Sequence, residues 1–212
     1  MRPDPGFSPR QGLGARGVGP KAGPRQNAFM RVRSVNGPVA NPAGPLRLAP
    51  AEGPVEIGPV GFSTDVEHAY AHALYAYPTL HWPVWQTMRA QARVAAPEDP
   101  VLPGMFDEHL SLDGIQESQL WLGDVLRFPR CDLVVSAPRL PDARFDVSLG
   151  FPQAAKMVGQ SRWCGAWLGV LRPGSIATGE EFTLVAGPRE VALLELLRTR
   201  TDKAKLQAGR GG

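Results

Sequence analysis

The sequence is poor in cysteine and has no long apolar run. Its 212 residues include only Cys131 and Cys164, too few for a disulfide framework and without the Cys-x-x-Cys spacing of structural zinc sites. No stretch of about 18 apolar residues could span a membrane, and the amino terminus lacks the apolar core of a secretory signal. These absences predict a soluble, cytoplasmic protein with no membrane partner.

Outside its first 30 residues the sequence also lacks an excess of basic charge. Residues 1–30 carry five Lys or Arg and the single acid Asp4, a net charge of +4, whereas the whole chain carries +3. The remaining residues sum to about −1, so the pI near 9.1 reflects the tail and not a basic binding face. The alternative, an RNA-binding arm, is disfavoured because the tail arginines have no aromatic neighbours for base stacking. We expect no nucleic-acid partner.

Glycine and proline are abundant instead, above all at the amino terminus. Of the 24 glycines and 22 prolines, six and five lie within residues 1–30. A segment of this composition cannot bury enough apolar surface to offset the entropy of ordering. The sequence therefore predicts a disordered tail over residues 1–29, one domain over residues 30–200 and a flexible tail over residues 201–212.

The rest of the chain consists mostly of short β-prone pieces separated by Gly and Pro turns. One helix is expected over residues 79–95, where Trp82, Trp85 and Met88 recur on one face as a core stripe, and another begins near Pro188. The expected strands cover residues 30–35, 44–48, 55–57, 120–122, 125–128, 132–135, 163–171 and 181–185. This pattern predicts a mainly β fold, a closed or nearly closed barrel with a few peripheral helices.

Two histidines stand four residues apart. On a helix, His68 and His72 would share a face and could bind a metal, but the pair lacks the Glu that completes a metalloprotease motif. Together with Glu108 and His109 they could form a nonsequential metal or cofactor site. The alternative is that these are ordinary polar or packed side chains, and the spacing alone favours that alternative.

Neither the acidic residues of the 113–117 run nor the second cysteine indicates a reaction by itself. Asp113 and Glu117 could be paired for acid–base chemistry, although a turn and a helix amino terminus explain them more simply. Cys164 lies in an apolar strand, where a thiol is expected to be a small buried hydrophobe. A nucleophilic cysteine would need a positive, partly exposed setting.

The segment that follows residues 132–135 places two arginines and a carboxylate in a proline-stiffened loop. Loops held on a rigid sheet commonly carry function, and the guanidinium groups of Arg139 and Arg144 suit bidentate recognition of phosphate. The alternative is that Asp142 simply forms an ion pair with one of them at the surface. The residues alone favour the ion pair.

The longest informative run is Gly104-Met-Phe-Asp-Glu-His-Leu-Ser-Leu-Asp-Gly-Ile-Gln-Glu-Ser-Gln-Leu-Trp-Leu-Gly-Asp-Val-Leu-Arg-Phe128. It resembles the Phe-Gly-Glu-Asn-Leu, Gly-Leu-x-Glu and Gly-Asp segments of the MOSC family, the domain named after the carboxyl-terminal part of molybdenum-cofactor sulfurases. Tyr75-Ala-Tyr-Pro78 and residues 165–175 fall in the matching order. The resemblance points to the stand-alone branch that includes bacterial hydroxylaminopurine reductases.

The resemblance is weakest where the family holds its cofactor. The family pattern Arg-x-Pro-Cys-x-Lys reads Arg139-Leu-Pro-Asp142-Ala-Arg144 here, so a hard carboxylate replaces the soft thiolate that suits molybdenum. The family motif His-Gly-Gly-x-Asp-Arg/Lys-Ala corresponds to residues 67–73, which lack both glycines, and Asp107 stands where the family has glycine. A retained scaffold with altered site motifs is what a domain would show after losing or changing its chemistry.

The resemblance implies a molybdenum cofactor, a pterin-dithiolene group, bound at the mouth of the barrel. It assigns Asp142 as metal ligand and catalytic residue in a two-electron reduction of an N-hydroxylated base or amine, which needs a small-molecule substrate and an electron-donor protein. The residues implied to bind the cofactor are Arg139, Arg144, His68, Glu108 and His109. The alternative is a non-catalytic relative, a binding or interaction module that keeps the barrel without the metal.

Overall fold

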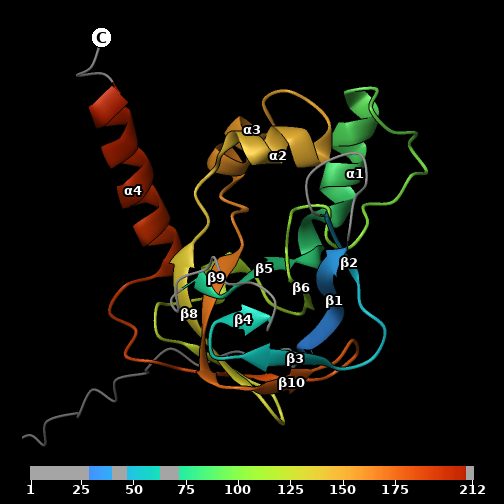
Figure 1. The fold of residues 1–212 in the computed structure, drawn as a ribbon. Helices are drawn as coiled ribbons and strands as arrows, with labels where there is room; N and C mark the ends of the chain where they lie inside the picture. The colour runs from blue at the N-terminus through green and yellow to red at the C-terminus, as the bar shows by residue number, and fades with distance from the viewer. Residues whose placement is uncertain (1–28, 40–46, 63–71, 209–212) are drawn as a thin grey trace, which may run out of the picture.

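The computed structural model describes residues 29–39, 47–62 and 72–208, and most of its elements there are strands (Figure 1). Eight strands form one mixed sheet in the order β11-β7-β8-β9-β5-β6-β1-β2, and three form a second sheet in the order β10-β3-β4. The strands are β1 (Arg31–Val39), β2 (Arg47–Pro50), β3 (Val55–Gly58), β4 (Gly61–Phe62), β5 (Leu74–Pro78), β6 (Leu110–Asp113), β7 (Val125–Arg127), β8 (Asp132–Pro138), β9 (Ala166–Arg172), β10 (Gly174–Ile176) and β11 (Thr183–Val185). The helices are η2 (Thr79–His81), α1 (Trp82–Gln91), η3 (Glu117–Gln119), α2 (Ala143–Leu149), α3 (Ala154–Ser161) and α4 (Leu193–Ala208). The predicted mainly β class is confirmed.

The core of the large sheet comes from strands whose side chains alternate between its two faces. In β8, Leu133, Val135 and Ala137 are buried, whereas the residues between them are only partly buried. Antiparallel pairing with β9 places Leu133 beside Val170 and Val135 beside Leu168. The sheet is therefore a packed aliphatic scaffold from which the connecting loops project.

The two ends of the large sheet approach each other without forming a continuous ladder. β2 pairs only with the second half of β1, which leaves the first half of that edge to the segment that precedes β11. There, Arg31 and Glu181 form an isolated bridge, and the Phe182 N–H donates to the Met30 carbonyl at 3.1 Å. The sheet thus does not close into the barrel that the sequence predicted, because β11 is short and these few bonds alone join its ends.

Three helices cover one end of the sheet and bring a second, aromatic-rich core with them. Figure 1 shows α1, α2 and α3 on the same side of the sheet. Trp85 is fully buried and donates its indole N–H to the Tyr77 hydroxyl at 2.8 Å, and the Tyr77 ring stacks on Phe106 with centroids 4.2 Å apart. Trp82 and Met88 pack partly buried against this cluster. The predicted core stripe of the first helix is thereby confirmed.

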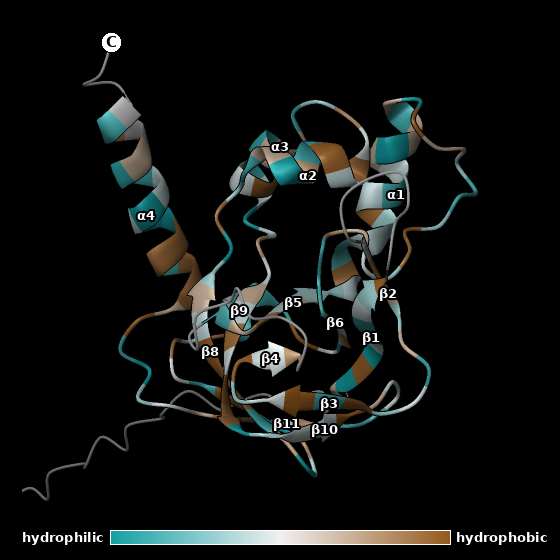
Figure 2. Cartoon of the chain, in the orientation of Figure 1, coloured by the Kyte–Doolittle hydropathy of each residue, from teal (hydrophilic) through white to brown (hydrophobic). Residues whose placement is uncertain are grey.

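The helices differ from the prediction at their boundaries. The helix expected over residues 79–95 is a 3-10 turn followed by α1, which ends at Gln91, and the closing helix begins at Leu193 and not near Pro188. Leu197 is the last buried side chain of α4, and Figure 2 shows the hydrophobic colour confined to that first part of the helix. The distal part of α4 therefore projects from the body, within the range predicted as a tail.

One predicted strand is wrong and one predicted segment falls outside the structure. Residues 120–122 contain only an isolated bridge between Trp121 and Ala192, since the chain turns directly into the Gly123 turn. The predicted tail over residues 1–29 lies outside the described residues except for Phe29. Within the described part of the chain, no helix has the length and apolarity needed to cross a membrane.

Candidate functional site

The segment between β8 and α2 carries the aspartate that stands in place of the MOSC cysteine. Asp142 has an extended backbone and caps α2, because its Oδ1 accepts a hydrogen bond from the Arg144 N–H at 2.9 Å. A carboxylate in this position satisfies a free helical N–H and interacts favourably with the positive end of the helix. The Asp142 side chain is half exposed. One of its oxygens is thus already engaged within the protein.

Arg139 is held on all sides. Its side chain is 6% exposed, and its guanidinium lies over the rings of Tyr75 and Phe145, with Cζ 4.8 and 4.3 Å from their centroids. Nη1 donates to the Phe106 carbonyl at 2.6 Å. Nη2 lies 3.7 Å from Oδ1 of Asp142, so the ion pair favoured by the sequence is present. Because most of its donors are used here, Arg139 orders the loop that precedes α2.

Asp107 completes the charge balance of Arg139. Its Oδ2 lies 3.5 Å from Arg139 Nη2 and accepts a hydrogen bond from the Ser148 hydroxyl of α2 at 3.1 Å. Its backbone is left-handed, with φ of 56°. This conformation explains why the family pattern has glycine at this position, since a Cβ is strained there. The departure noted in the sequence is therefore a strained residue that two side chains hold in place.

The Glu108 carboxylate organises its own loop. It is fully buried and accepts hydrogen bonds from the N–H groups of Gly104 and Phe106, both at 2.9 Å, and from the Ser111 hydroxyl at 2.7 Å. Burial raises the pKa of Glu108 to about 7, and these hydrogen bonds limit the rise. The carboxylate that was expected to line a cofactor pocket thus fixes residues 104–108, including the Phe106 carbonyl that binds Arg139.

The histidines do not join this group among the described residues. His109 is 5% exposed, its Nδ1 accepts a hydrogen bond from the Tyr75 N–H at 2.9 Å, and its ring lies 5.2 Å from Phe62. This bond ties β5 to the start of β6. His72 stacks with Trp167, with centroids 5.5 Å apart. His68 lies outside the described residues, so its predicted role stays a prediction.

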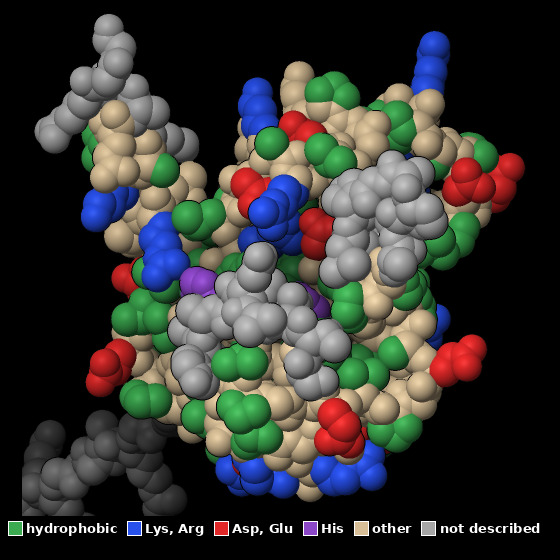
Figure 3. Space-filling view, in the orientation of Figure 1, with side chains coloured by type: hydrophobic (Ala, Val, Ile, Leu, Met, Phe, Trp, Pro, Cys, Tyr) green, Lys and Arg blue, Asp and Glu red, His purple; other side chains and the backbone are tan. Residues whose placement is uncertain are grey.

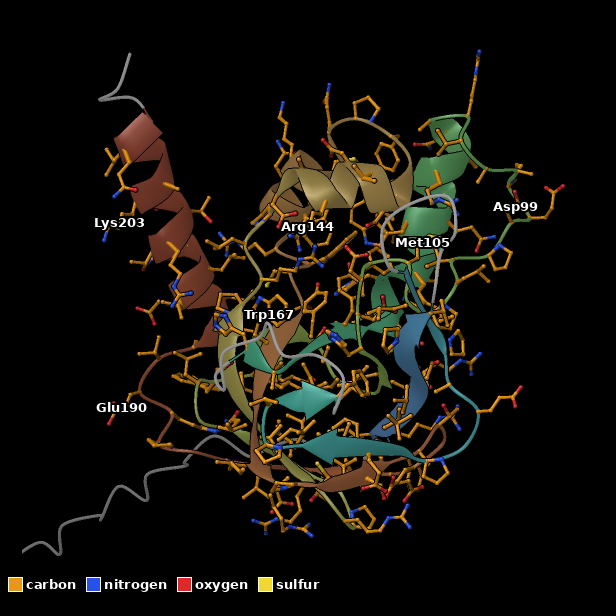
Figure 4. The ribbon with its side chains drawn as sticks, viewed as in Figure 1. Asp99, Met105, Arg144, Trp167, Glu190 and Lys203 are labelled. Carbon is orange, nitrogen blue, oxygen red and sulfur yellow. The ribbon has the colours of Figure 1, made fainter. Side chains whose placement is uncertain are left out.

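Arg144 is the exposed cation of the predicted set. Its backbone N–H is bound by Asp142, while its side chain makes no printed-distance contact with the described residues and is exposed. Figure 4 shows it at the start of α2, with Trp167 of β9 on the sheet below. Figure 3 shows acidic and basic side chains next to one another under α2 and α3. An external anion could therefore reach Arg144 more readily than Arg139.

A buried acid–base pair lies beside the aromatic core, and the sequence prediction missed it. Nε2 of His81 is 2.9 Å from Oε2 of Glu117, and Oε1 of Glu117 accepts the Gly165 N–H at 3.0 Å. The His81 ring stacks on Trp163 at 4.7 Å. The sequence placed Glu117 correctly at a helix amino terminus, but its partner is 36 positions away. No local spacing could have revealed that pair.

Both thiols are buried in apolar surroundings. Burial raises the pKa of Cys131 to about 12 and the pKa of Cys164 still further above its usual range. A thiol that stays protonated is a poor nucleophile and a poor metal ligand. Cys164 is thus the buried hydrophobe that the sequence predicted.

The described residues do not fit a molybdenum centre held by a protein thiolate. The position that would supply the thiolate holds Asp142, which caps α2, and the two existing thiols are buried and protonated. No cluster of three or more His, Cys, Asp or Glu side chains within the described ranges could hold a metal ion. The polar groups around Arg139 satisfy one another.

Comparison with known proteins identifies the family. The model of the MOSC domain matches residues 58–183, more than half of the chain. The chain belongs to the MOSC domain family. Curated relatives include the uncharacterized protein YflK of Bacillus subtilis, 26% identical over 114 residues, and the protein YiiM of Escherichia coli, 28% identical over 124 residues. These alignments cover 54% and 58% of this MOSC chain and 48% and 53% of the relatives, so it spans about half of their length.

Solved structures share the fold of this MOSC protein. YiiM from Geobacillus stearothermophilus superposes with a TM-score of 0.64 and 24% identity over 81% of this chain and 83% of that one. YiiM from Escherichia coli gives a TM-score of 0.59 and 22% identity over 80% and 75% of the two chains. The family membership inferred from residues 104–128 is confirmed.

Proposed function

We propose that this MOSC protein is a binding module that keeps the fold of its family without thiolate ligation of molybdenum. The observation that carries the proposal is the use of Asp142: the residue in the cysteine position caps α2 and balances the charge of Arg139. A carboxylate spent on a helix cap is a weak starting point for holding a soft metal. The cytoplasm remains the proposed location.

The surroundings of Asp142 support the same proposal. Arg139 donates to the Phe106 carbonyl and pairs with two aspartates, and the loop around Phe106 is fixed by the buried Glu108. A site built to receive a large cofactor would keep such donors directed at the cofactor. Here they hold the protein together, and Arg144 is left as the exposed cation for an external anionic group.

The test is the metal content of protein purified from cells that make the molybdenum cofactor. Wild type, Asp142→Ala and Asp142→Asn are compared by elemental analysis and pterin fluorescence. We expect far less than one molybdenum per chain in all three. Asn keeps the helix cap and Ala does not, so the pair separates loss of a ligand from loss of structure. Molybdenum near one per chain in wild type that both variants abolish would overturn the proposal.

A second candidate is a molybdenum-cofactor-dependent reductase of N-hydroxylated bases or amines. It is favoured by the retained Arg139-Leu-Pro sequence before Asp142 and by the half-exposed Asp142 carboxylate, which could act as a hard ligand. It requires a small-molecule substrate and an electron-donor protein. Asp142→Cys restores the family ligand; if it gains molybdenum while wild type has none, the scaffold is competent and the aspartate is what excludes the metal.

A further inference from the structure

A groove away from Arg139 lies between α1 and the neighbouring strands β1 and β6. It has a volume of about 310 Å³. The residues that line it are Arg33, Thr79, Trp82, Pro83, Gln86, Pro100, Val101 and Asp113. Figure 1 shows α1 next to the β1 side of the sheet. The groove shares none of these residues with the candidate site.

One wall of the groove carries an unpaired hydrogen-bond donor. The indole nitrogen Nε1 of Trp82 is buried and has no hydrogen-bond partner, and it is the one buried side-chain nitrogen or oxygen in this condition among the described residues. The indole N–H of Trp85, one turn further along α1, has found the Tyr77 hydroxyl. Orphaned buried donors are rare because each forfeits a hydrogen bond that water would have supplied.

The groove also carries an excess positive charge. Arg33 is exposed on the outer face of β1, and its side chain has no ion pair or hydrogen bond with any described residue. Asp113, the acid of the groove, is already neutralised, since its Oδ2 is 3.1 Å from Nε of Arg31 and its Oδ1 accepts from the Thr79 hydroxyl. Arg33 is therefore the cation that remains available to a ligand.

The remaining surface of the groove is apolar. Pro83 and the pair Pro100 and Val101 supply side chains without donors, and the Trp82 ring adds a flat face. A ligand that fits must combine an apolar body with a negatively charged acceptor. We propose that this groove binds a small organic carboxylate, whose oxygens pair with the Arg33 guanidinium and accept from the Trp82 indole N–H.

The Trp82 indole N–H is the probe for this site, and benzoate is the test ligand. In ¹⁵N-labelled protein the five tryptophans give separate indole signals, and Trp82→Phe identifies the one from Trp82. Titration with benzoate should shift that signal saturably. Arg33→Gln should weaken the binding by about tenfold, because it removes a charge-assisted contact. Arg127→Gln, at an exposed position in β7, is the matched control and should leave it unchanged.

Two further ligands decide the chemistry. Benzamide has the same ring without the charge and should shift the Trp82 signal much less than benzoate at equal concentration. Inorganic phosphate separates a carboxylate site from a general anion site. The proposal is overturned if benzoate leaves the Trp82 signal unmoved, if Arg33→Gln binds benzoate as wild type does, or if phosphate binds while benzoate does not.

Discussion

The large sheet and the α2 end of the molecule satisfy their buried groups in opposite ways. The sheet interior is filled by aliphatic side chains such as Leu133 and Leu168. Around α2, the buried Arg139 is balanced by Asp107 and Asp142, which are 46% and 50% exposed. The sheet keeps the family fold, and the departures from the family motifs lie at the α2 end. Apolar packing can therefore preserve a fold while polar residues at its edge come to satisfy one another.

The largest effect is expected in the sheet. Leu133 is fully buried, and Leu133→Ala should lower the free energy of unfolding by about 3 kcal/mol, because it removes apolar contacts and leaves a cavity. Leu171→Ala, at a 58% exposed position in β9, is the matched control and should change it by less than about 0.5 kcal/mol. Urea unfolding measures both variants. Equal losses in the two would contradict the assignment of this face as core.

Glu108 should make the α2 end sensitive to pH. Burial raises its pKa from 4.5 to about 7, so between these values the folded protein binds more protons at this residue than the unfolded chain does. The stability linked to Glu108 is therefore complete below about pH 4.5 and falls by roughly 3 kcal/mol as the pH rises to 7.

Glu108→Gln provides the control for this pH dependence, since an amide does not ionise. The free energies of unfolding of wild type and variant, measured in guanidinium chloride at pH 5 and pH 7.5, should show a steeper loss with pH in wild type. Parallel pH profiles would show that Glu108 does not titrate in this range.

Asp107 sharpens the comparison because its strain and its ion pair oppose each other. Asp107→Gly relaxes the left-handed backbone, whereas Asp107→Ala keeps the strain, and both lose the contact with Arg139. The Ala variant should be less stable than the Gly variant by about 1 kcal/mol. Thermal unfolding of the two proteins in parallel gives this difference. A Gly variant that is the less stable of the two would mean that the backbone at this position is not strained.

The smallest effect concerns the cap of α2. Asp142→Ala removes the acceptor of the Arg144 N–H and should destabilise the protein by roughly 0.5–1 kcal/mol, whereas Asp142→Asn keeps an acceptor and should lose less. Calorimetric melting of wild type and both variants tests this. If Asn is as damaging as Ala, the charge toward Arg139 matters more than the cap.

The strands that could be predicted are those with a clear alternation or an apolar run between turns. β7, β8 and β9 were found because turn residues flank them. β5 was missed, since every one of its residues is buried and a strand covered on both faces shows no alternation. Closure of the sheet could not be predicted either, because it depends on how far β2 extends along β1.

The site was predictable only in its local part. The pairing of Asp142 with Arg139, three positions apart, was among the alternatives that the sequence offered. Glu108 and His109 are adjacent in sequence, yet one binds its own loop and the other binds β5, which spacing cannot distinguish. The His81 and Glu117 pair depends on tertiary structure alone.

The few bonds that join the ends of the large sheet form a seam. At this seam the Met30 carbonyl receives the Phe182 N–H, just where the described chain begins. Fluctuations that open the sheet should start there, since fewer hydrogen bonds must break than along β8 and β9. Shortening the chain by one residue beyond Phe29 would remove an acceptor that closes the seam. The tolerance of this protein to amino-terminal trimming or fusion is therefore set by Met30, far from the residues that define its family.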